Sequence, residues 1–142
     1  MSTPDSRRSD VGLFLIRAAL GVTFAAHGAQ KVFDRGIGAV AQGFESMGIP
    51  FAQVVGPLVG FGELFGGIAL LVGFLTRWAG AGLSLIMVGA LVLVHLRNGF
   101  FAGDGGIEFV LVLGAGAAGL ALTGAGRYAL DARVGSRPRS PG

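Results

Sequence analysis

The chain has 142 residues, of which 52% are hydrophobic and 13% charged, and its mean hydropathy is +0.70. This composition excludes an ordinary soluble domain, in which roughly a quarter of the residues carry a charge. The net charge of +3 does not indicate nucleic-acid binding, because the basic residues are scattered through loops and tails without interleaved aromatic residues. The chain has no cysteine, which excludes disulfides, a thiol nucleophile and thiolate metal ligands.

The first apolar run covers residues 11–29 and follows a polar segment, residues 1–10, which we expect to be a disordered tail. A basic pair before an apolar run is also how a secretory signal peptide begins. However, this run exceeds the usual 7–15 residues of a signal sequence, and it contains Arg17. The pattern therefore favours a first membrane span.

Residues 37–47 show apolar side chains at the i, i+3, i+4, i+7 spacing of one helix face. The segment is too short to span a membrane, so we predict a short interfacial helix between the first and second spans. Gly48, Ile49 and Pro50 form the turn that ends it.

The second span is predicted over residues 54–75, in which Glu63 is the only charged residue. At 100° per residue this carboxylate shares its helix face with small residues, which let a neighbouring helix approach closely. An acid placed in such a contact needs a partner or a proton, because an unpaired charge in a bilayer costs about 2.5–3.5 kcal/mol. The small residues on this face are Gly56, Gly60 and Gly67.

Two further spans are predicted over residues 78–94, which begin with the interfacial anchor Trp78, and over residues 107–123. Short connections between four spans predict an all-α membrane four-helix bundle with up-down-up-down topology, covering residues 11–126. Residues 127–142 are polar and basic, and we expect them to form a disordered tail.

Basic residues near the helix ends predict the orientation of the bundle, because Lys and Arg are enriched on the cytoplasmic side. The side with more of them carries both termini, so both termini are predicted to be cytoplasmic in a bacterial inner (plasma) membrane. That side has Arg7, Arg8, Arg77, Arg127, Arg133, Arg137 and Arg139, and the other has Lys31, Arg35 and Arg97.

Arg17 and Glu63 are predicted to form an ion pair inside the membrane. If the first helix ends at Ala29 and the second begins at Val54, they lie about 18 Å and 14 Å below the outer surface. The alternative is that Arg17 extends its side chain to the cytoplasmic interface.

A second polar group is predicted at the outer end of the bundle, where antiparallel packing brings the ends of three helices to one level. Its members are His27, Lys31, His95, Asn98 and Glu108. Together with the predicted Arg17–Glu63 pair as a floor, they would form a polar pocket. Four interpretations stay open: helix-capping residues without another role, a quinone-like or other hydrophobic ligand site, metal or haem ligation, and a proton path. Haem or metal is the weakest, because two histidines without a ligand-spacing motif carry little specificity.

The sequence resembles the DoxX family of small four-helix membrane proteins. The resemblance combines Arg17, the His27–Lys31 run, Glu63, His95 and Glu108 with a late Gly126…Asp131, and it spans nearly the whole chain outside the tails. The matching segments are LFLIRAALGVTFAAHGAQKVF (13–33), GELFGGIALLVGFLTRWAG (62–80), VHLRNGFF (94–101) and GIEFVLVLGAGAAGLALTGAGRYALDA (106–132).

The resemblance implies an inner-membrane protein associated with redox enzymes, in quinone-linked oxidoreductase or oxidative-stress assemblies. Our leading hypothesis is a redox-associated subunit whose pocket holds a quinone-like headgroup or another small hydrophobic molecule. The rival hypothesis is a non-catalytic scaffold that docks respiratory or oxidative-stress proteins, and a small transporter ranks third because no span is broken by a mid-membrane proline. The expected partners are the lipid bilayer and redox proteins, and self-association stays open.

Overall fold

The computed structural model describes residues 4–135, and every regular element in that range is helical. This confirms the predicted all-α class. The π-helical segments η1 (Gln30–Gly36) and η2 (Leu91–His95) continue two of the long helices, and the 3₁₀ turns η3 (Leu96–Asn98) and η4 (Ala102–Asp104) lie in one connection. The α-helices are α1 (Pro4–Ala29), α2 (Ile37–Ser46), α3 (Ala52–Val72), α4 (Thr76–Ala90), α5 (Glu108–Thr123) and α6 (Leu130–Val134).

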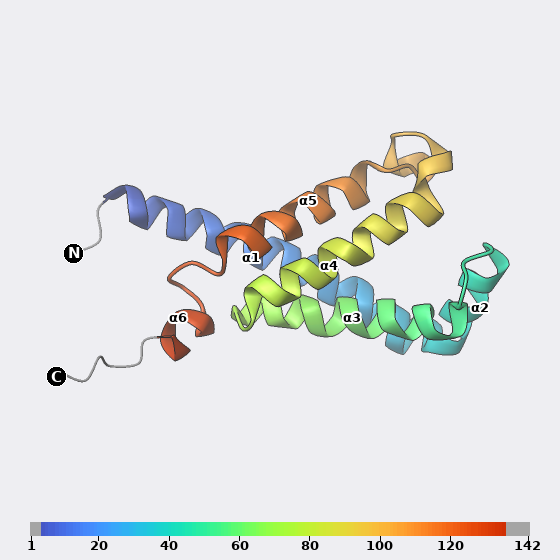
Figure 1. Cartoon of the computed structure of the whole chain (residues 1–142), viewed down its shortest axis with the longest axis horizontal. Coiled ribbons are helices and arrows are strands. Elements are labelled where there is room, and N and C mark those ends of the chain that lie inside the picture. The colour runs from blue at the N-terminus through green and yellow to red at the C-terminus, as the bar shows by residue number, and fades with distance from the viewer. Residues whose placement is uncertain (1–3, 136–142) are drawn as a thin grey trace.

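The long helices form two antiparallel pairs, α1 with α3 and α4 with α5 (Figure 1). The pairs meet where α3 turns into α4, close to α6, and they spread apart toward the opposite end (Figure 1). We call the end with the turn at residues 73–75 the hairpin end. The end with η1, α2 and the α4–α5 connection is the open end.

Glycines allow α1 and α3 to pack with their backbones nearly touching. A Cβ atom added at Gly28 would lie 2.2 Å from the backbone nitrogen of Leu64, and one at Gly67 would lie 2.2 Å from that of Ala25. Only residues without a side chain fit at such contacts, as is typical of close helix packing in membranes. These contacts fix the register of α1 against α3.

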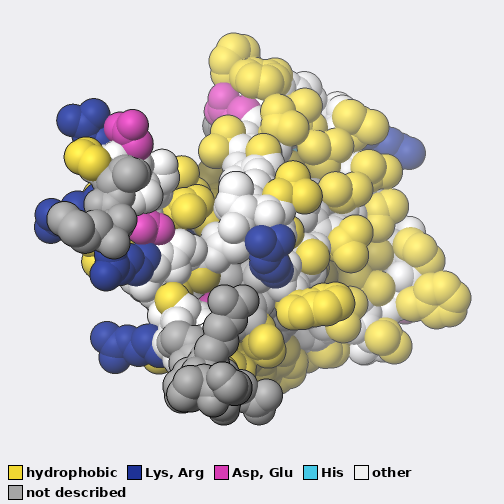
Figure 2. Space-filling model, turned by 60° about the vertical axis from the view of Figure 1, so that its left-hand side comes forward, with side chains coloured by type: hydrophobic (Ala, Val, Ile, Leu, Met, Phe, Trp, Pro, Cys, Tyr) yellow, Lys and Arg dark blue, Asp and Glu magenta, His cyan; other side chains and the backbone are white. Residues whose placement is uncertain are grey.

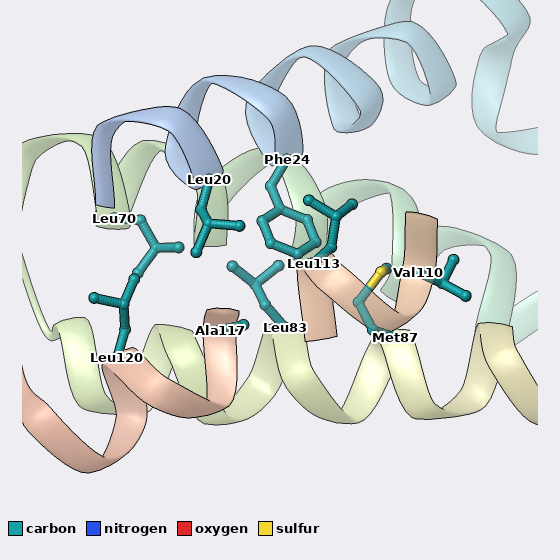
Figure 3. Close-up of a cluster of buried hydrophobic side chains, with 9 residues drawn as sticks. All are labelled: Leu20, Phe24, Leu70, Leu83, Met87, Val110, Leu113, Ala117 and Leu120. Carbon is teal, nitrogen blue, oxygen red and sulfur yellow. The ribbon is translucent and has the colours of Figure 1, made fainter. Parts of the chain in front are cut away.

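The buried core lies where all four long helices come together, and Figure 3 shows its side chains pointing toward one another. It comprises Leu20 and Phe24 of α1, Leu70 of α3, Leu83 and Met87 of α4, and Val110, Leu113, Ala117 and Leu120 of α5.

The outer surface of the helices is also apolar, and hydrophobic side chains dominate much of the face in Figure 2. Leu85 and Leu122 are 72% and 78% exposed. Three helical segments are long and apolar enough to cross a membrane: Pro4–Ser46, Ala52–Val72 and Thr76–Asn98. The fourth, Glu108–Thr123, is apolar but has 16 residues, about 24 Å of helix at 1.5 Å per residue. The surface and these lengths fit a bundle whose solvent is lipid.

The segments predicted to be disordered tails are partly helical. Helix α1 begins at Pro4 within the predicted N-terminal tail, and Asp5 in its first turn suits the positive end of the helix dipole. Helix α6 lies within the predicted C-terminal tail and is held to the hairpin end by the backbone of Asp131, whose N–H donates to Gly73 O at 2.9 Å. The rest of that predicted tail, residues 136–142, lies outside the described residues.

Helix α2 forms close to its predicted bounds and buries Val40 and Ala41. It packs on the start of α3, where a Cβ at Gly56 would lie 2.9 Å from Ala41 Cα.

Helix α3 ends at Val72, before the predicted residue 75, because Gly73 adopts φ +70° and Phe74 N–H bonds back to Ala69 O at 2.9 Å. This left-handed glycine ends the helix and starts the turn into α4.

Candidate functional site

Arg17 lies at the hairpin end, with 1% of its surface exposed. Its Nη1 donates to Leu70 O at 2.6 Å and Leu71 O at 2.8 Å, and its Nη2 donates to Tyr128 O. The guanidinium thus satisfies carbonyls in the last turn of α3, where the helix dipole favours a positive charge. The predicted Arg17–Glu63 pair is wrong, because Arg17 bonds to backbone carbonyls and not to a carboxylate.

Asp131 binds the other helix terminus at the hairpin end, the start of α4. Its Oδ1 accepts the N–H of Leu75 at 2.7 Å, and its Oδ2 accepts the N–H of Thr76 at 2.9 Å. A carboxylate at these two amides suits the positive end of α4. Asp131 is also the acidic group that acts electrostatically on Arg17. We call Arg17, Asp131 and the backbone groups they bind the arginine–aspartate cap.

Glu63 pairs with Lys31, whose Nζ lies 2.5 Å from Glu63 Oε2. The side chains are 5% and 20% exposed, respectively. The prediction that the buried acid needs a cationic partner identified the kind of partner but not the residue. The error lies in the register: the prediction set Ala29 level with Val54, whereas Gly28 contacts Leu64, ten residues further along α3. The helix also continues through η1, which places Lys31 one turn beyond Gly28.

His27 lies between the two helix pairs. Its ring packs edge-on against Phe109 in the first turn of α5, with the ring centroids 5.6 Å apart. The imidazole is half-buried, and it contributes to the contact between α1 and α5. It is one turn from Lys31 along the same helix.

The three other candidate residues bond within the α4–α5 connection. His95 Nδ1–H donates to Gly105 O at 2.6 Å, and the side-chain amide of Asn98 donates to the same carbonyl at 3.2 Å. Glu108 Oε1 accepts the N–H of Ala102 at 2.7 Å. Among the seven candidates, only Lys31 and Glu63 are bonded to each other. The predicted Arg17–Glu63 floor of the polar pocket is therefore absent, and the grouping of the other candidates around one pocket stays a prediction.

A cavity of about 540 Å³ lies between α3 and α4, where the two helices diverge toward the open end. None of the seven candidate residues lines it, and all of its lining side chains are apolar or glycine. We call it the α3–α4 groove. Its lining residues are Phe44, Ile49, Val55, Leu58, Val59, Gly62, Gly66, Ala79, Gly82, Leu83, Leu85, Ile86, Gly89, Ala90, Leu93 and Val94. Residues 4–135 hold no group of three or more His, Cys, Asp or Glu side chains that could bind a metal.

The candidate residues chosen from the sequence do not include Asp131 or the groove. Asp131 lies in a segment interpreted as a disordered tail, although it is the only acidic residue after Glu108. Its isolation and its place in the family resemblance are the two signals that could have singled it out. The groove leaves no motif in the sequence, because glycine, leucine and valine line it as they line any membrane helix.

The fold and the apolar surface define a small helical membrane protein. Its buried charged side chains either bond to backbone groups at a helix end or form one ion pair. The family model for DoxX matches residues 12–96. The chain therefore belongs to the DoxX family, as the sequence resemblance predicts.

Three relatives match most of the chain. It is 34% identical over 124 residues to "Putative oxidoreductase CatD" of Bacillus subtilis, covering 86% of both chains. It is 35% identical over 138 residues to "Uncharacterized membrane protein Rv3486" of Mycobacterium tuberculosis, covering 89% of this chain and 83% of that one. It is 34% identical over 127 residues to "Inner membrane protein YqjF" of Escherichia coli, covering 86% and 91%. No solved structure matches the chain.

Proposed function

We propose that this protein is a redox-associated membrane subunit that binds a quinone-like or other small hydrophobic molecule in the α3–α4 groove. The observation that carries the proposal is the groove itself, a cavity of about 540 Å³ with an apolar lining. Ligand sites in proteins commonly have volumes of roughly 300–1,000 Å³ and are lined mainly by hydrophobic side chains. The redox association rests on family membership and on the relative named as an oxidoreductase.

The groove suits one part of a quinone better than the other. A prenyl chain needs only apolar contacts, which Leu58, Leu85 and Leu93 offer. The ring carbonyls need hydrogen-bond donors, and no lining side chain supplies one. Polar residues adjoin the lining at the open end: His95 directly follows the lining residue Val94, and Glu45, which bonds to Gln53 at 3.3 Å, directly follows the lining residue Phe44. The proposal therefore places the chain of the ligand in the groove and its ring toward the open end.

A bound quinone would supply two-electron chemistry, and the residues of this chain would hold and orient it. The chain has no cysteine and therefore no thiol to act as an electron donor, and the proposal assigns the supply of electrons to a redox partner protein. The topology belongs to the same proposal: an inner (plasma) membrane location with both termini cytoplasmic. The excess of basic residues near the hairpin end and the name of the E. coli relative support it.

Two glycines allow the groove to be filled without disturbing the helices. A Cβ added at Gly82 or Gly89 meets no atom within 4 Å, although both residues line the groove. The double substitution Gly82→Leu/Gly89→Leu should therefore occupy the groove and leave the fold intact. Gly119→Leu on α5 is the matched control, because its added Cβ also meets nothing and it lies outside the groove.

The experiment measures ligand in protein purified from native membranes, by mass spectrometry of extracted lipids and quinones and by titration with a short-chain ubiquinone. We expect the wild type and Gly119→Leu to bind equally and the double variant to bind at least about tenfold more weakly, since about 1.4 kcal/mol of lost packing gives that factor. Absence of binding to the wild type, or equal binding to the double variant, contradicts the proposal.

A non-catalytic scaffold is the second candidate, and two observations favour it. The two buried charged residues have structural partners, since Arg17 bonds to backbone carbonyls and Glu63 pairs with Lys31. Phe100 and Phe101 form an exposed aromatic pair at the open end, 52% and 66% exposed with ring centroids 5.5 Å apart. A scaffold predicts that Phe100→Ser/Phe101→Ser abolishes copurification of a partner while Gly82→Leu/Gly89→Leu leaves it unchanged. The ligand proposal predicts that the groove substitutions remove the bound ligand and the phenylalanine substitutions do not.

A further inference from the structure

The long helices form two close-packed units. In the first, which comprises α1, η1, α2 and α3, a Cβ atom added at Gly28 or at Gly67 would lie 2.2 Å from the backbone of the facing helix. In the second, which comprises α4, α5 and their connection, a Cβ at Gly80 would lie 2.6 Å from Ala117 O. Contacts of one backbone with another leave little room for movement. Each helix pair therefore forms one rigid unit.

The contacts between the two pairs are made by side chains. A Cβ at Gly66 of α3 would lie 2.9 Å from the side chain of Leu83 on α4, not from the backbone of that helix. Nearer the open end, the rings of His27 and Phe109 pack edge to face. Side chains in such contacts shift by small amounts when packed helices slide over one another. The surface between the pairs is thus the one along which the molecule deforms most easily.

Hydrogen bonds between the two pairs gather at the hairpin end. There Arg17 of α1 donates to Tyr128 O, beyond the end of α5, and Asp10 Oδ1 of α1 accepts the N–H of Arg127 at 3.0 Å. At the open end, every side-chain hydrogen bond within residues 4–135 joins groups of the same pair. These bonds are Lys31–Glu63, Ser46–Gly43 and Gln53–Glu45 in the first pair, and His95–Gly105, Asn98–Val94, Asn98–Gly105 and Ala102–Glu108 in the second.

We propose that the two helix pairs rotate against each other about the arginine–aspartate cap, so that the α3–α4 groove widens and narrows at the open end. The one stretch of chain that connects the pairs, residues 73–75, also lies at the hairpin end. The cap and this turn form the hinge, and the pairs are the moving bodies (Figure 1).

A small rotation changes the groove substantially, because the groove lies far from the hinge. Helix α3 has 21 residues, a length of about 31 Å, so a rotation of about 10° moves its open end by about 5 Å. Leu58 and Leu93, which line the groove, are 64% and 52% exposed, so the groove faces the lipid. The motion therefore opens a lateral entrance from the membrane, whichever apolar molecule uses it.

The test is pulsed electron–electron resonance on the full-length chain in lipid nanodiscs, with two nitroxide labels on introduced cysteines. The chain has no cysteine of its own, so the labels attach only at the chosen sites. Val54→Cys/Leu96→Cys reports across the open end, from 67% and 55% exposed positions. We expect its distance distribution to be about 5 Å wider than those of the controls, which is the displacement expected for a rotation of about 10°.

Two label pairs are the matched controls. Leu15→Cys/Leu122→Cys spans the same two helix pairs at the hairpin end, from 60% and 78% exposed positions. Leu15→Cys/Val54→Cys runs along the first pair from one end to the other. Both distributions should be narrow. An open-end distribution as narrow as that of the controls, or a hairpin-end distribution as wide as that of the open end, overturns the proposal.

Two variants then locate the moving groove and the hinge. Gly82→Leu/Gly89→Leu puts side chains into the groove, so the open-end distances should lengthen and their distribution should narrow, while the hairpin-end distances stay unchanged. Asp131→Ala removes the acceptor of two amides at the start of α4, so the hairpin-end distribution should widen. An unchanged open-end distribution in the filled variant, or an unchanged hairpin-end distribution in Asp131→Ala, contradicts a groove that closes about this cap.

Discussion

The two ends of the molecule neutralise their buried charges in different ways. At the hairpin end, Arg17 and Asp131 bond to backbone groups of segments far away in the sequence. At the open end, Lys31 and Glu63 bond to each other, and the remaining polar residues bond within the short α4–α5 connection. A charge bonded to a helix terminus fixes where that helix ends, whereas a pair of side chains fixes only how close two helices lie.

This difference explains why the bundle is closed at one end and spread at the other. The arginine–aspartate cap binds the end of α3, the start of α4 and residue 128 together. At the open end, no hydrogen bond in the described part of the chain joins α3 to α4 or to the α4–α5 connection. The α3–α4 groove opens on this side, where the helices are free of such a constraint.

The largest expected effect comes from Arg17→Ala. The substitution removes the guanidinium donor to the carbonyls of three residues in an apolar region, of which Leu70 O keeps only the N–H of Gly73 at 3.2 Å. It also removes the positive charge on which Asp131 acts. We expect the free energy of unfolding to fall by about 4 kcal/mol, the range found when one partner of a buried charge network is removed. Denaturant titration in detergent micelles, followed by far-UV circular dichroism, measures it.

Arg17→Lys sharpens this prediction because it keeps the positive charge and loses the planar guanidinium group with its several N–H donors. A lysine reaches one or two of the three carbonyls, so about half of the lost stability should return. Full recovery with lysine would show that charge alone matters at the hairpin end. No loss with alanine would mean that the cap does not hold the two helices together.

The sequence predicted the helices of this protein much better than their register. Apolar runs and glycine faces are local features, so the spans were recoverable to within a few residues in the interior of the chain. The level of one helix against another depends on contacts between distant residues, such as Gly28 with Leu64. A nine-residue error in that level was enough to assign Arg17, instead of Lys31, to Glu63.

The arginine–aspartate cap was only half predictable for a related reason. A buried arginine within a span signals that some acceptor must exist, and the sequence suggested a carboxylate because Glu63 was the only acid in the next span. Backbone carbonyls, such as that of Leu70, are equally good acceptors, but every residue has one. Hydrogen bonds to backbone carbonyls therefore cannot be predicted from the identities of the accepting residues.

The second prediction concerns the ion pair at the open end. Lys31→Met leaves the almost fully buried Glu63 without its cation and should cost about 2.5 kcal/mol, as for an unpaired acid in a bilayer. Glu63→Gln should cost less, because Lys31 is partly exposed and its long side chain reaches the interface. Unfolding titrations of both variants measure this asymmetry.

The double variant Lys31→Met/Glu63→Leu is the control for that asymmetry. Replacing a buried pair by apolar residues of similar size is often neutral, so we expect it to be more stable than Lys31→Met alone. If the double variant is the least stable of the three, the pair contributes net stability and the open end resembles the hairpin end after all.

The third prediction is a loss of about 2 kcal/mol for Asp131→Ala, since two backbone amides at the start of α4 lose their acceptor. Leu75 adopts φ +48°, a conformation that its side chain disfavours and that the bond to Asp131 helps to hold. Amide hydrogen exchange should accelerate at Leu75 and Thr76 and stay unchanged at the open end. Asp131→Asn keeps one acceptor oxygen and should show roughly half the loss.

The smallest expected effect is that of His95→Ala, at most about 1 kcal/mol, which is the typical net value of one hydrogen bond. Gly105 O loses the imidazole donor but keeps the amide of Asn98 at 3.2 Å. The carbonyl is therefore still satisfied, and the connection should keep its conformation. Thermal unfolding of His95→Ala, Asn98→Ala and the double variant measures the three losses.

The double variant is the decisive member of that set, because only it leaves Gly105 O without a side-chain donor. Its loss should exceed the sum of the single losses, since each single variant is compensated by the remaining donor. At the hairpin end no such substitute exists at Leu71 O, to which Arg17 is the sole side-chain donor in the described chain, whereas Leu70 O also accepts the N–H of Gly73 at 3.2 Å. Strictly additive losses at His95 and Asn98 would remove this distinction between a redundant loop and an indispensable cap.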